Sequence, residues 1–96
     1  MNIYVDIDNT ICETNGREYA KAKPLYKNIK KINNLFDEGN KIHYWTARGT
    51  LTKIDFYDLT KNQLDKWKCK YHSLSVGEKT AYDLLICDKT KRIEEI

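Results

Sequence analysis

Two kinds of apolar pattern alternate along this chain, and the alternation restricts the folds open to it. Short segments rich in β-branched and aromatic residues predict buried strands, at Asn2–Asp6, Lys41–Thr46, Ser73–Val76 and 82–87. Longer segments with apolar residues three and four positions apart predict amphipathic helices over 24–39 and about 55–70. Strands joined by helical crossovers form a parallel sheet. The expected fold is therefore α/β, a three-layer α/β/α arrangement around a Rossmann-like parallel sheet.

The length of the chain limits what can be added to that core. Ninety-six residues suffice for one domain, so residues 1–96 are expected to form a single unit. Residues 9–23 show no clean period and contain Gly16, which predicts a loop. Its part from 11 to 23 is long enough only for a flap, so we expect a minimal core without a cap domain.

Charge is mild and does not identify a polyanionic partner. The net charge is +3, from 17 Lys and Arg against 14 Asp and Glu. One local excess of cations lies at Lys21, Lys23, Lys27, Lys30 and Lys31. A solvated helix face is the preferred interpretation of this cluster, and attraction of a phosphorylated ligand is the alternative. Nucleic acid as a partner is therefore not favoured.

Cysteine usage and the first residues predict a cytoplasmic protein. Cys12, Cys69 and Cys87 cannot all pair, and they lack the spacing of a zinc or redox site. A reducing compartment is favoured. Asp6 and Asp8 stand where a signal peptide would need an apolar stretch, so we expect neither a secretory leader nor a membrane partner.

Polar side chains gather where the predicted strands end. Asp6 and Asp8 follow the first strand, Thr46 closes the second, and Lys79 and Asp88 flank the last. Ligands of parallel α/β sheets bind at the carboxyl ends of the strands. Two carboxylates so close together repel unless a cation or proton lies between them, and Mg²⁺ prefers such oxygen ligands. Each residue alone is more typical of a turn, a cap or a solvated surface; their order along the chain is what favours a site.

This order resembles that of the haloacid dehalogenase superfamily of phosphatases, over residues 3 to 89. Asp6-Ile7-Asp8-Asn9-Thr10 is similar to the family's first motif, and Thr46-Ala47-Arg48 to the variant of small capless members linked to polysaccharide biosynthesis. The runs 77–83 and 84–89 resemble the closing motifs of that group. The resemblance implies a Mg²⁺-dependent phosphomonoesterase, acting on a sugar phosphate or related metabolite of surface-polysaccharide biosynthesis.

The resemblance also implies catalytic roles. Asp6 would be the nucleophile that forms an aspartyl-phosphate, and Asp8 the general acid and then the base. Thr46, with the backbone N–H of Ala47, would hold a phosphoryl oxygen, while Lys79 would neutralise its charge.

Metal and substrate contacts are implied in the same way. Asp6, the backbone carbonyl of Asp8, and Asp88 would bind Mg²⁺. Arg48 is the candidate to contact substrate, because its planar fork can grip a carboxylate or a second phosphate; a salt-bridged surface arginine is the alternative.

The sequence departs from the family pattern at two positions, and other functions remain open. Cys87 stands in place of an acid, and Thr80 in place of a proline. Without a cap, the open site would accept a bulky phosphate or be roofed by a second copy of the chain. A phosphatase of nucleic-acid ends or phosphoprotein is one alternative, and a catalytically weak phosphate-binding module is another. A receiver domain is disfavoured, since no acid lies at Ser73–Val76.

Overall fold

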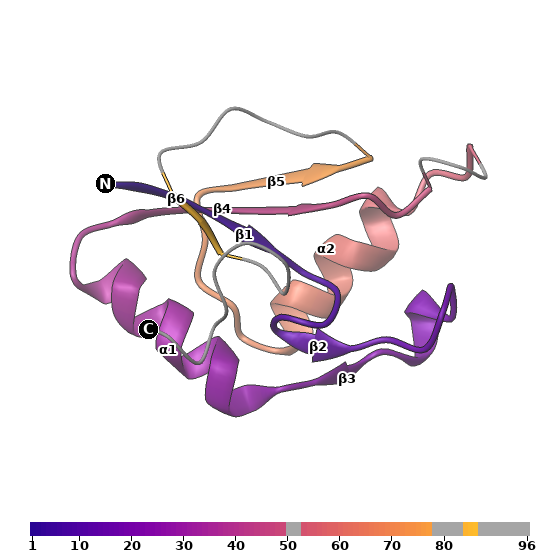
Figure 1. Ribbon diagram of the computed structural model, residues 1–96, viewed down its shortest axis with the longest axis horizontal. Helices are drawn as coiled ribbons and strands as arrows, with labels where there is room; N and C mark the ends of the chain where they lie inside the picture. Colours follow the sequence, from indigo (N-terminus) through magenta and orange to yellow (C-terminus); the bar gives the residue numbers. More distant parts are fainter. Residues whose placement is uncertain (50–52, 78–83, 87–96) are drawn as a thin grey trace.

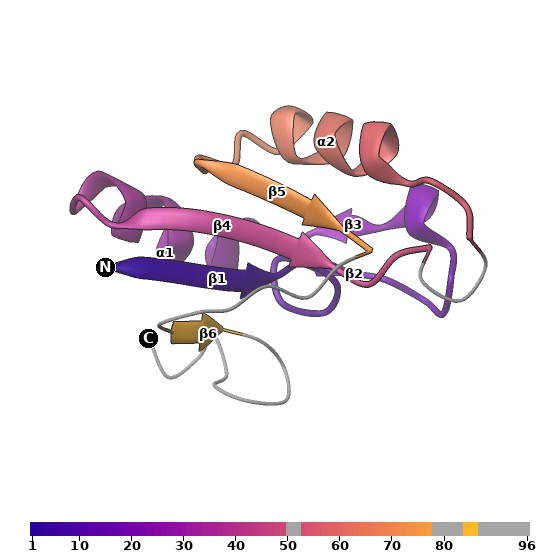
Figure 2. The same cartoon turned by 90° about the horizontal axis from the view of Figure 1, so that it is seen from above.

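The computed structural model describes residues 1–49, 53–77 and 84–86. Four parallel strands form one sheet in the order β5-β4-β1-β6 (Figure 1). They are β1 (Asn2–Asp6), β4 (Lys41–Thr46), β5 (Ser73–Val76) and β6 (Leu84–Ile86). The chain moves outward from β1 to β4 and β5, and then returns to the other side of β1 (Figure 2). This confirms the α/β fold class with a Rossmann-like parallel sheet.

Two helices cover one face of the sheet. Helix α1 (Tyr26–Asp37) connects β1 to β4, and helix α2 (Tyr57–Lys66) connects β4 to β5. Both lie on the same side of the sheet, below it in Figure 1. Successive right-handed crossovers in one direction require this arrangement. The segments that would provide the expected layer on the other face, 78–83 and 87–96, lie outside the described residues.

The core forms between this face and the helices. Parallel pairing sets Ile3 beside Ile42 and Val5 beside Tyr44, and all four side chains are buried. Alternate residues of β1 and β4 are only half-buried or exposed. The full buried apolar cluster is Ile3, Val5, Ile7, Ile11, Cys12, Ile29, Ile32, Ile42, Tyr44, Leu64 and Trp67. The alternate burial along β1 and β4 is the side-chain period of two of a half-buried strand, whereas the strands were predicted from their β-branched and aromatic residues.

The loop between β1 and α1 contains more structure than its sequence predicted. Its two ends form a short antiparallel ribbon of β2 (Cys12–Glu13) and β3 (Lys23–Pro24), and a 3₁₀ turn (Tyr19–Lys21) lies between them. Helix α1 therefore begins at Tyr26, not at Pro24. Proline is tolerated at the edge of such a ribbon because its missing N–H donates to no neighbour. The pairing of β2 with β3 thus joins the two ends of the flap where it leaves and rejoins the core.

The second helix is shorter than its apolar period predicted. Asp55 Oδ1 accepts a hydrogen bond of 2.9 Å from the Tyr57 backbone N–H, and the helix begins there. It ends at Lys66, and Lys68 has a left-handed φ of 60° that turns the chain toward β5. An Asx turn before the helix and a left-handed residue after it set the two ends of the helix for local reasons, which a period of 3.6 does not contain.

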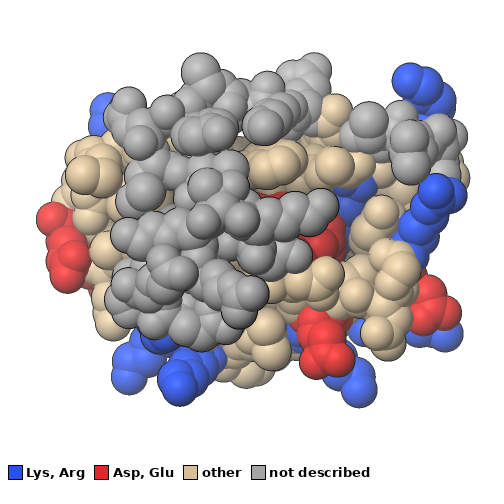
Figure 3. All heavy atoms as spheres, viewed as in Figure 1, with Lys and Arg blue, Asp and Glu red and all other residues tan. Residues whose placement is uncertain are grey.

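Charged side chains of both signs lie on the described part of the face drawn in Figure 3. The face in Figure 3 shows Lys and Arg interspersed with Asp and Glu, without a continuous basic stripe. Within the predicted lysine cluster, Lys21 lies 4.0 Å from Glu18, and both side chains are exposed. Among the described residues, no helix has the length and apolar character to cross a bilayer.

Candidate active site

The segment after β1 turns sharply. Asn9 has a left-handed φ of 62°, a conformation that asparagine tolerates better than most residues. The backbone N–H groups of Thr10 and Ile11 both donate to the Ile7 carbonyl, at 3.2 and 3.1 Å. Asn28 of α1 donates through Nδ2 to the Thr10 carbonyl at 2.9 Å. These bonds fix the turn that presents Asp8 at the carboxyl edge of the sheet, beside the point where the strand order reverses.

The carboxylate of Asp8 is the centre of a hydrogen-bonded cluster. Thr14 Oγ1 donates to Asp8 Oδ1 at 2.7 Å, and Thr46 Oγ1 donates to Oδ2 at 2.9 Å. Arg48 Nη2 donates to Oδ1 at 2.8 Å, and its Nε lies 3.1 Å from Oδ2. Thr46 and Arg48 both come from the end of β4, so the predicted first and second motifs do meet. Both carboxylate oxygens of Asp8 are engaged within the protein.

Arg48 lies buried beside Asp8. Its side chain has 0% of its surface exposed, whereas that of Asp8 has 21%. Its Nη1 donates to Thr60 Oγ1 at 3.1 Å and to Gln63 Oε1 at 2.6 Å, both on α2. The salt bridge that was the alternative to a substrate contact is therefore present, but it is buried and its partner is Asp8. A contact between Arg48 and substrate stays a prediction. A planar guanidinium suits this site better than a lysine ammonium, because its N–H groups donate in several fixed directions at once.

The same cluster reaches the flap. Gln63 Nε2 donates to the Tyr19 carbonyl at 2.6 Å, and the Arg48 guanidinium lies 4.9 Å from the Tyr19 ring centre. A cation over an aromatic face is attracted by the ring quadrupole. Asp8, β4, α2 and the 3₁₀ turn of the flap are thus connected through one buried arginine.

Sequence reasoning missed Thr14 and Gln63, and it assigned Thr60 to an apolar helix face. All three are buried polar residues that complete the hydrogen bonds of Asp8 or Arg48. Gln63 immediately precedes the core residue Leu64, three positions after Thr60. Polar residues next to a buried helix stripe are the signal that could have identified them, because buried polar groups need partners.

Electrostatics keep Asp8 ionised. Burial alone raises the pKa of this carboxyl, but the hydrogen bonds and charge of Arg48 lower it, helped by Thr14 and Thr46, and the net pKa lies below the usual value. At neutral pH the group is therefore a carboxylate. It can accept a proton as a base, whereas acting as an acid requires it first to be protonated.

We expect this carboxylate to make stability depend on acid pH. Because its pKa is lower in the folded protein than in the unfolded chain, it stabilises the fold above the unfolded value of about 4. That contribution is lost as pH falls through the lower folded pKa. Urea unfolding at several pH values should show that Asp8→Asn is less stable than the wild type at pH 7. The difference should shrink as pH falls below about 4, and a constant difference would contradict the assignment.

The other predicted residues are only partly placed. Asp6 is half-buried at the end of β1, in register with Trp45 of β4. Thr46 is buried, and Ala47 is exposed directly after it. Lys79 and Asp88 lie outside the described residues. The residues present are of the type that binds Mg²⁺, because all of them supply oxygen ligands. Asp6 would supply a carboxylate. Asp8 would supply its backbone carbonyl, since its side chain is hydrogen-bonded within the protein. Within the described ranges no three acids, histidines or cysteines form a metal cluster.

Comparisons with known proteins support the fold. No family model matches the chain, and no curated protein matches it significantly. The crystal structure of a structural-genomics target from Vibrio cholerae is similar, with a TM-score of 0.73 and 22% sequence identity. The match covers 95% of this chain and 76% of that protein. At this identity the likeness shows the fold alone.

Proposed function

We propose that this protein is a Mg²⁺-dependent phosphomonoesterase of the haloacid dehalogenase type, acting on a sugar phosphate or related metabolite of surface-polysaccharide biosynthesis. The observation that carries the proposal is the meeting of two motifs at one edge of the sheet. Asp6 ends β1, Asp8 follows it, and Thr46 Oγ1 of β4 donates a hydrogen bond of 2.9 Å to Asp8. This edge borders the strand-order reversal, where open α/β sheets bind ligands.

The chemistry assigns different work to the two aspartates. A carboxylate oxygen of Asp6 attacks phosphorus in line, and the bond from phosphorus to the alcohol oxygen breaks as an aspartyl-phosphate forms. Asp8, when it carries a proton, donates that proton to the departing alcohol oxygen and is left as a carboxylate. Asp8 then takes a proton from the water that attacks this intermediate, which releases phosphate and restores Asp6. When bound by Asp6, the Asp8 carbonyl and Asp88, Mg²⁺ would offset the negative charge of the phosphoryl oxygens. Lys79 would contribute a further positive charge.

The lowered pKa of Asp8 suits the second step better than the first. An alkoxide leaving group needs a proton, and Asp8 carries one only in a small fraction of molecules near neutral pH. A phenolate leaves without such help. An aryl phosphate is therefore the appropriate first probe of this site.

The decisive experiment is hydrolysis of 4-nitrophenyl phosphate with and without Mg²⁺. We expect turnover that appears with Mg²⁺, disappears with excess EDTA and returns when the ion is restored. The same chain with Asp8→Asn should be much slower, because no carboxylate remains to accept the proton of water. Equal rates in Mg²⁺ and EDTA would refute the proposal.

One observation favours a second candidate, a phosphate-binding module with little turnover. The Asp8 carboxylate already accepts hydrogen bonds from Thr14, Thr46 and Arg48. A carboxylate with these bonds is a weak acceptor for a further proton. This candidate predicts that phosphate binds in the presence of Mg²⁺, as measured by calorimetry, without hydrolysis of any phosphomonoester. Both candidate functions thus predict that phosphate binds in the presence of Mg²⁺, and only the first predicts hydrolysis of a phosphomonoester.

A cytoplasmic location is part of the proposal. Cys12 and Cys69 are both free thiols, and Cys87 lies outside the described residues. Burial raises the pKa of the Cys12 thiol, and burial raises that of Cys69 to about 12. Thiols of this kind are unreactive and pack as small apolar groups, which suits a reducing compartment.

A further inference from the structure

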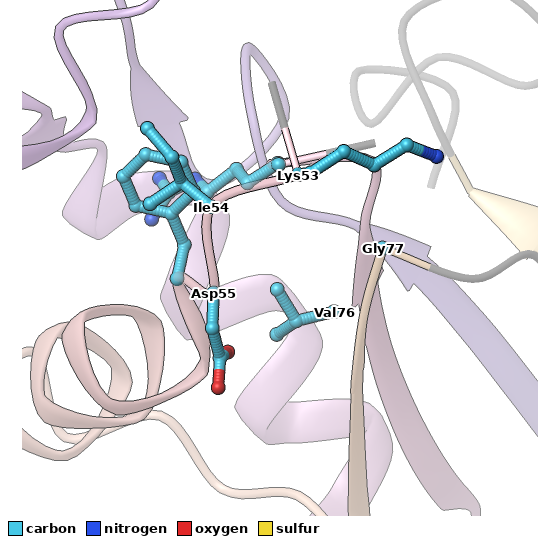
Figure 4. A pocket seen from close by; sticks show the side chains of 8 residues that line it. Lys53, Ile54, Asp55, Val76 and Gly77 are labelled. Carbon is cyan, nitrogen blue, oxygen red and sulfur yellow. The ribbon is translucent and has the colours of Figure 1, made fainter. Parts of the chain in front are cut away.

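A pocket of about 300 Å³ opens at the same edge of the sheet, beyond the ends of β4 and β5 (Figure 4). Its volume is at the lower end of the range of small-molecule sites. The lining residues come from the segment after β4 and from the end of β5: Arg48, Gly49, Lys53, Ile54, Asp55, Phe56, Val76 and Gly77. The pocket therefore begins two residues after Thr46, beside the cluster that holds Asp8.

The backbone builds this pocket by a tight return of the chain. Gly49 has a φ of 85°, and a Cβ atom there would collide with the Ile54 carbonyl oxygen. The Lys53 backbone N–H donates to the Gly49 carbonyl at 2.8 Å, so residues 53–56 fold back over Gly49. On the opposite wall, the Gly77 N–H donates to the Thr46 carbonyl at 2.7 Å. Both walls are thus attached to the end of β4.

The walls of the pocket are about half apolar. Ile54, Phe56 and Val76 provide side-chain carbon, and Ile54 remains 56% exposed. An apolar side chain that stays so exposed at the rim of a pocket gains stability when another molecule covers it.

One cation at the rim is available to a ligand. Lys53 is exposed, and within the described part of the chain it has no ion pair, while the nearby Asp55 accepts from the Tyr57 N–H at 2.9 Å. In Figure 4 the Lys53 side chain extends away from the Asp55 carboxylate. Its left-handed backbone, with a φ of 62°, holds it at the turn. The pocket therefore combines apolar side chains with the positive charge of Lys53 and the negative charge of Asp55, and these two charges point away from each other.

We propose that this pocket binds the alcohol part of the substrate, and that the substrate carries a second anionic group, which pairs with Lys53. The inference rests on the proposed phosphomonoesterase function and specifies its substrate class. The phosphoryl group would lie toward Asp6 and Thr46, and an apolar face of the alcohol would pack against Ile54, Phe56 and Val76. The anionic group is a carboxylate or a further phosphate, since both match an ammonium.

The test compares two aryl phosphates of the same shape, 4-carboxyphenyl phosphate and its neutral amide, 4-carbamoylphenyl phosphate. An exposed ion pair contributes up to about 1 kcal/mol, so kcat/KM should favour the carboxylate by about two- to fivefold. Lys53→Gln should bring the ratio of the two kcat/KM values close to one, and Lys53→Arg should restore it. Lys61→Gln, which removes an exposed cation on α2, should leave the ratio unchanged. A ratio that is the same in the wild type and Lys53→Gln would overturn the inference.

Failure of the proposed function would give a different result, namely no metal-dependent turnover of either compound. The subsite is then tested by binding alone, with NMR titration of 4-carboxyphenyl phosphate against the methyl groups of Ile54 and the amide of Gly77. Shifts at these positions that Lys53→Gln abolishes would support the subsite. Their absence would overturn it, whatever the chemistry of the site.

Discussion

Replacing Asp6 with asparagine should reduce turnover of 4-nitrophenyl phosphate by at least about a thousandfold, because the amide oxygen cannot form the covalent intermediate. Asp6 and asparagine have the same shape, and Asp6 is half-buried at the end of β1, so the fold should persist. The measurement is kcat at saturating Mg²⁺, with circular dichroism and thermal unfolding to verify the folded state.

A matched control comes from α2. Asp58 is exposed in the first turn of the helix, and Asp58→Asn removes the same charge without touching the strand ends. It should retain wild-type kcat. Trapping adds a second readout: acid quenching during turnover should leave phosphate bound to the wild-type chain and not to Asp6→Asn. Wild-type rates in Asp6→Asn would eliminate this residue as the nucleophile.

The sheet and helices could be predicted from the sequence because they follow from local patterns. Asn2–Asp6 and Lys41–Thr46 are short and rich in β-branched and aromatic residues, and the structure forms strands there that bury alternate residues. The flap ribbon could not be predicted in this way. Each of its strands has two residues, too few for a period, and Pro24 is as typical of a helix start as of an edge strand.

The motif residues were predictable as a set, and the role of Arg48 was not. Its neighbours Thr46 and Ala47 identify the turn after β4, but the direction of the arginine side chain depends on α2, which follows later in the chain. Thr60 and Gln63 of α2 provide the buried acceptors to which Arg48 Nη1 donates. A contact between distant segments leaves no trace in local periodicity, so the sequence alone left a substrate contact and a salt-bridged surface arginine equally open.

Arg48→Met should be the most destabilising of the substitutions considered for this site. It leaves the Asp8 carboxylate without its guanidinium partner, and Thr60 and Gln63 without their donor. Removing one partner of a buried ion pair costs about 3–5 kcal/mol, a large share of the stability of a small domain. Urea unfolding should show this loss, and Tm should fall by more than about 10 °C. Arg17→Met, at an exposed arginine of the flap, should change the free energy of unfolding by less than about 0.5 kcal/mol.

A double substitution keeps this prediction testable even when Arg48→Met does not fold. In Asp8→Asn/Arg48→Met the uncompensated charge is gone, so the double variant should be more stable than Arg48→Met alone. Arg48→Lys should fall between the wild type and Arg48→Met, because it keeps the charge and loses the fork that reaches Asp8, Thr60 and Gln63 together. If the effects of the two single substitutions simply add, Arg48 is not the counterion of Asp8. Strong coupling between them would establish that the buried arginine is the counterion of Asp8.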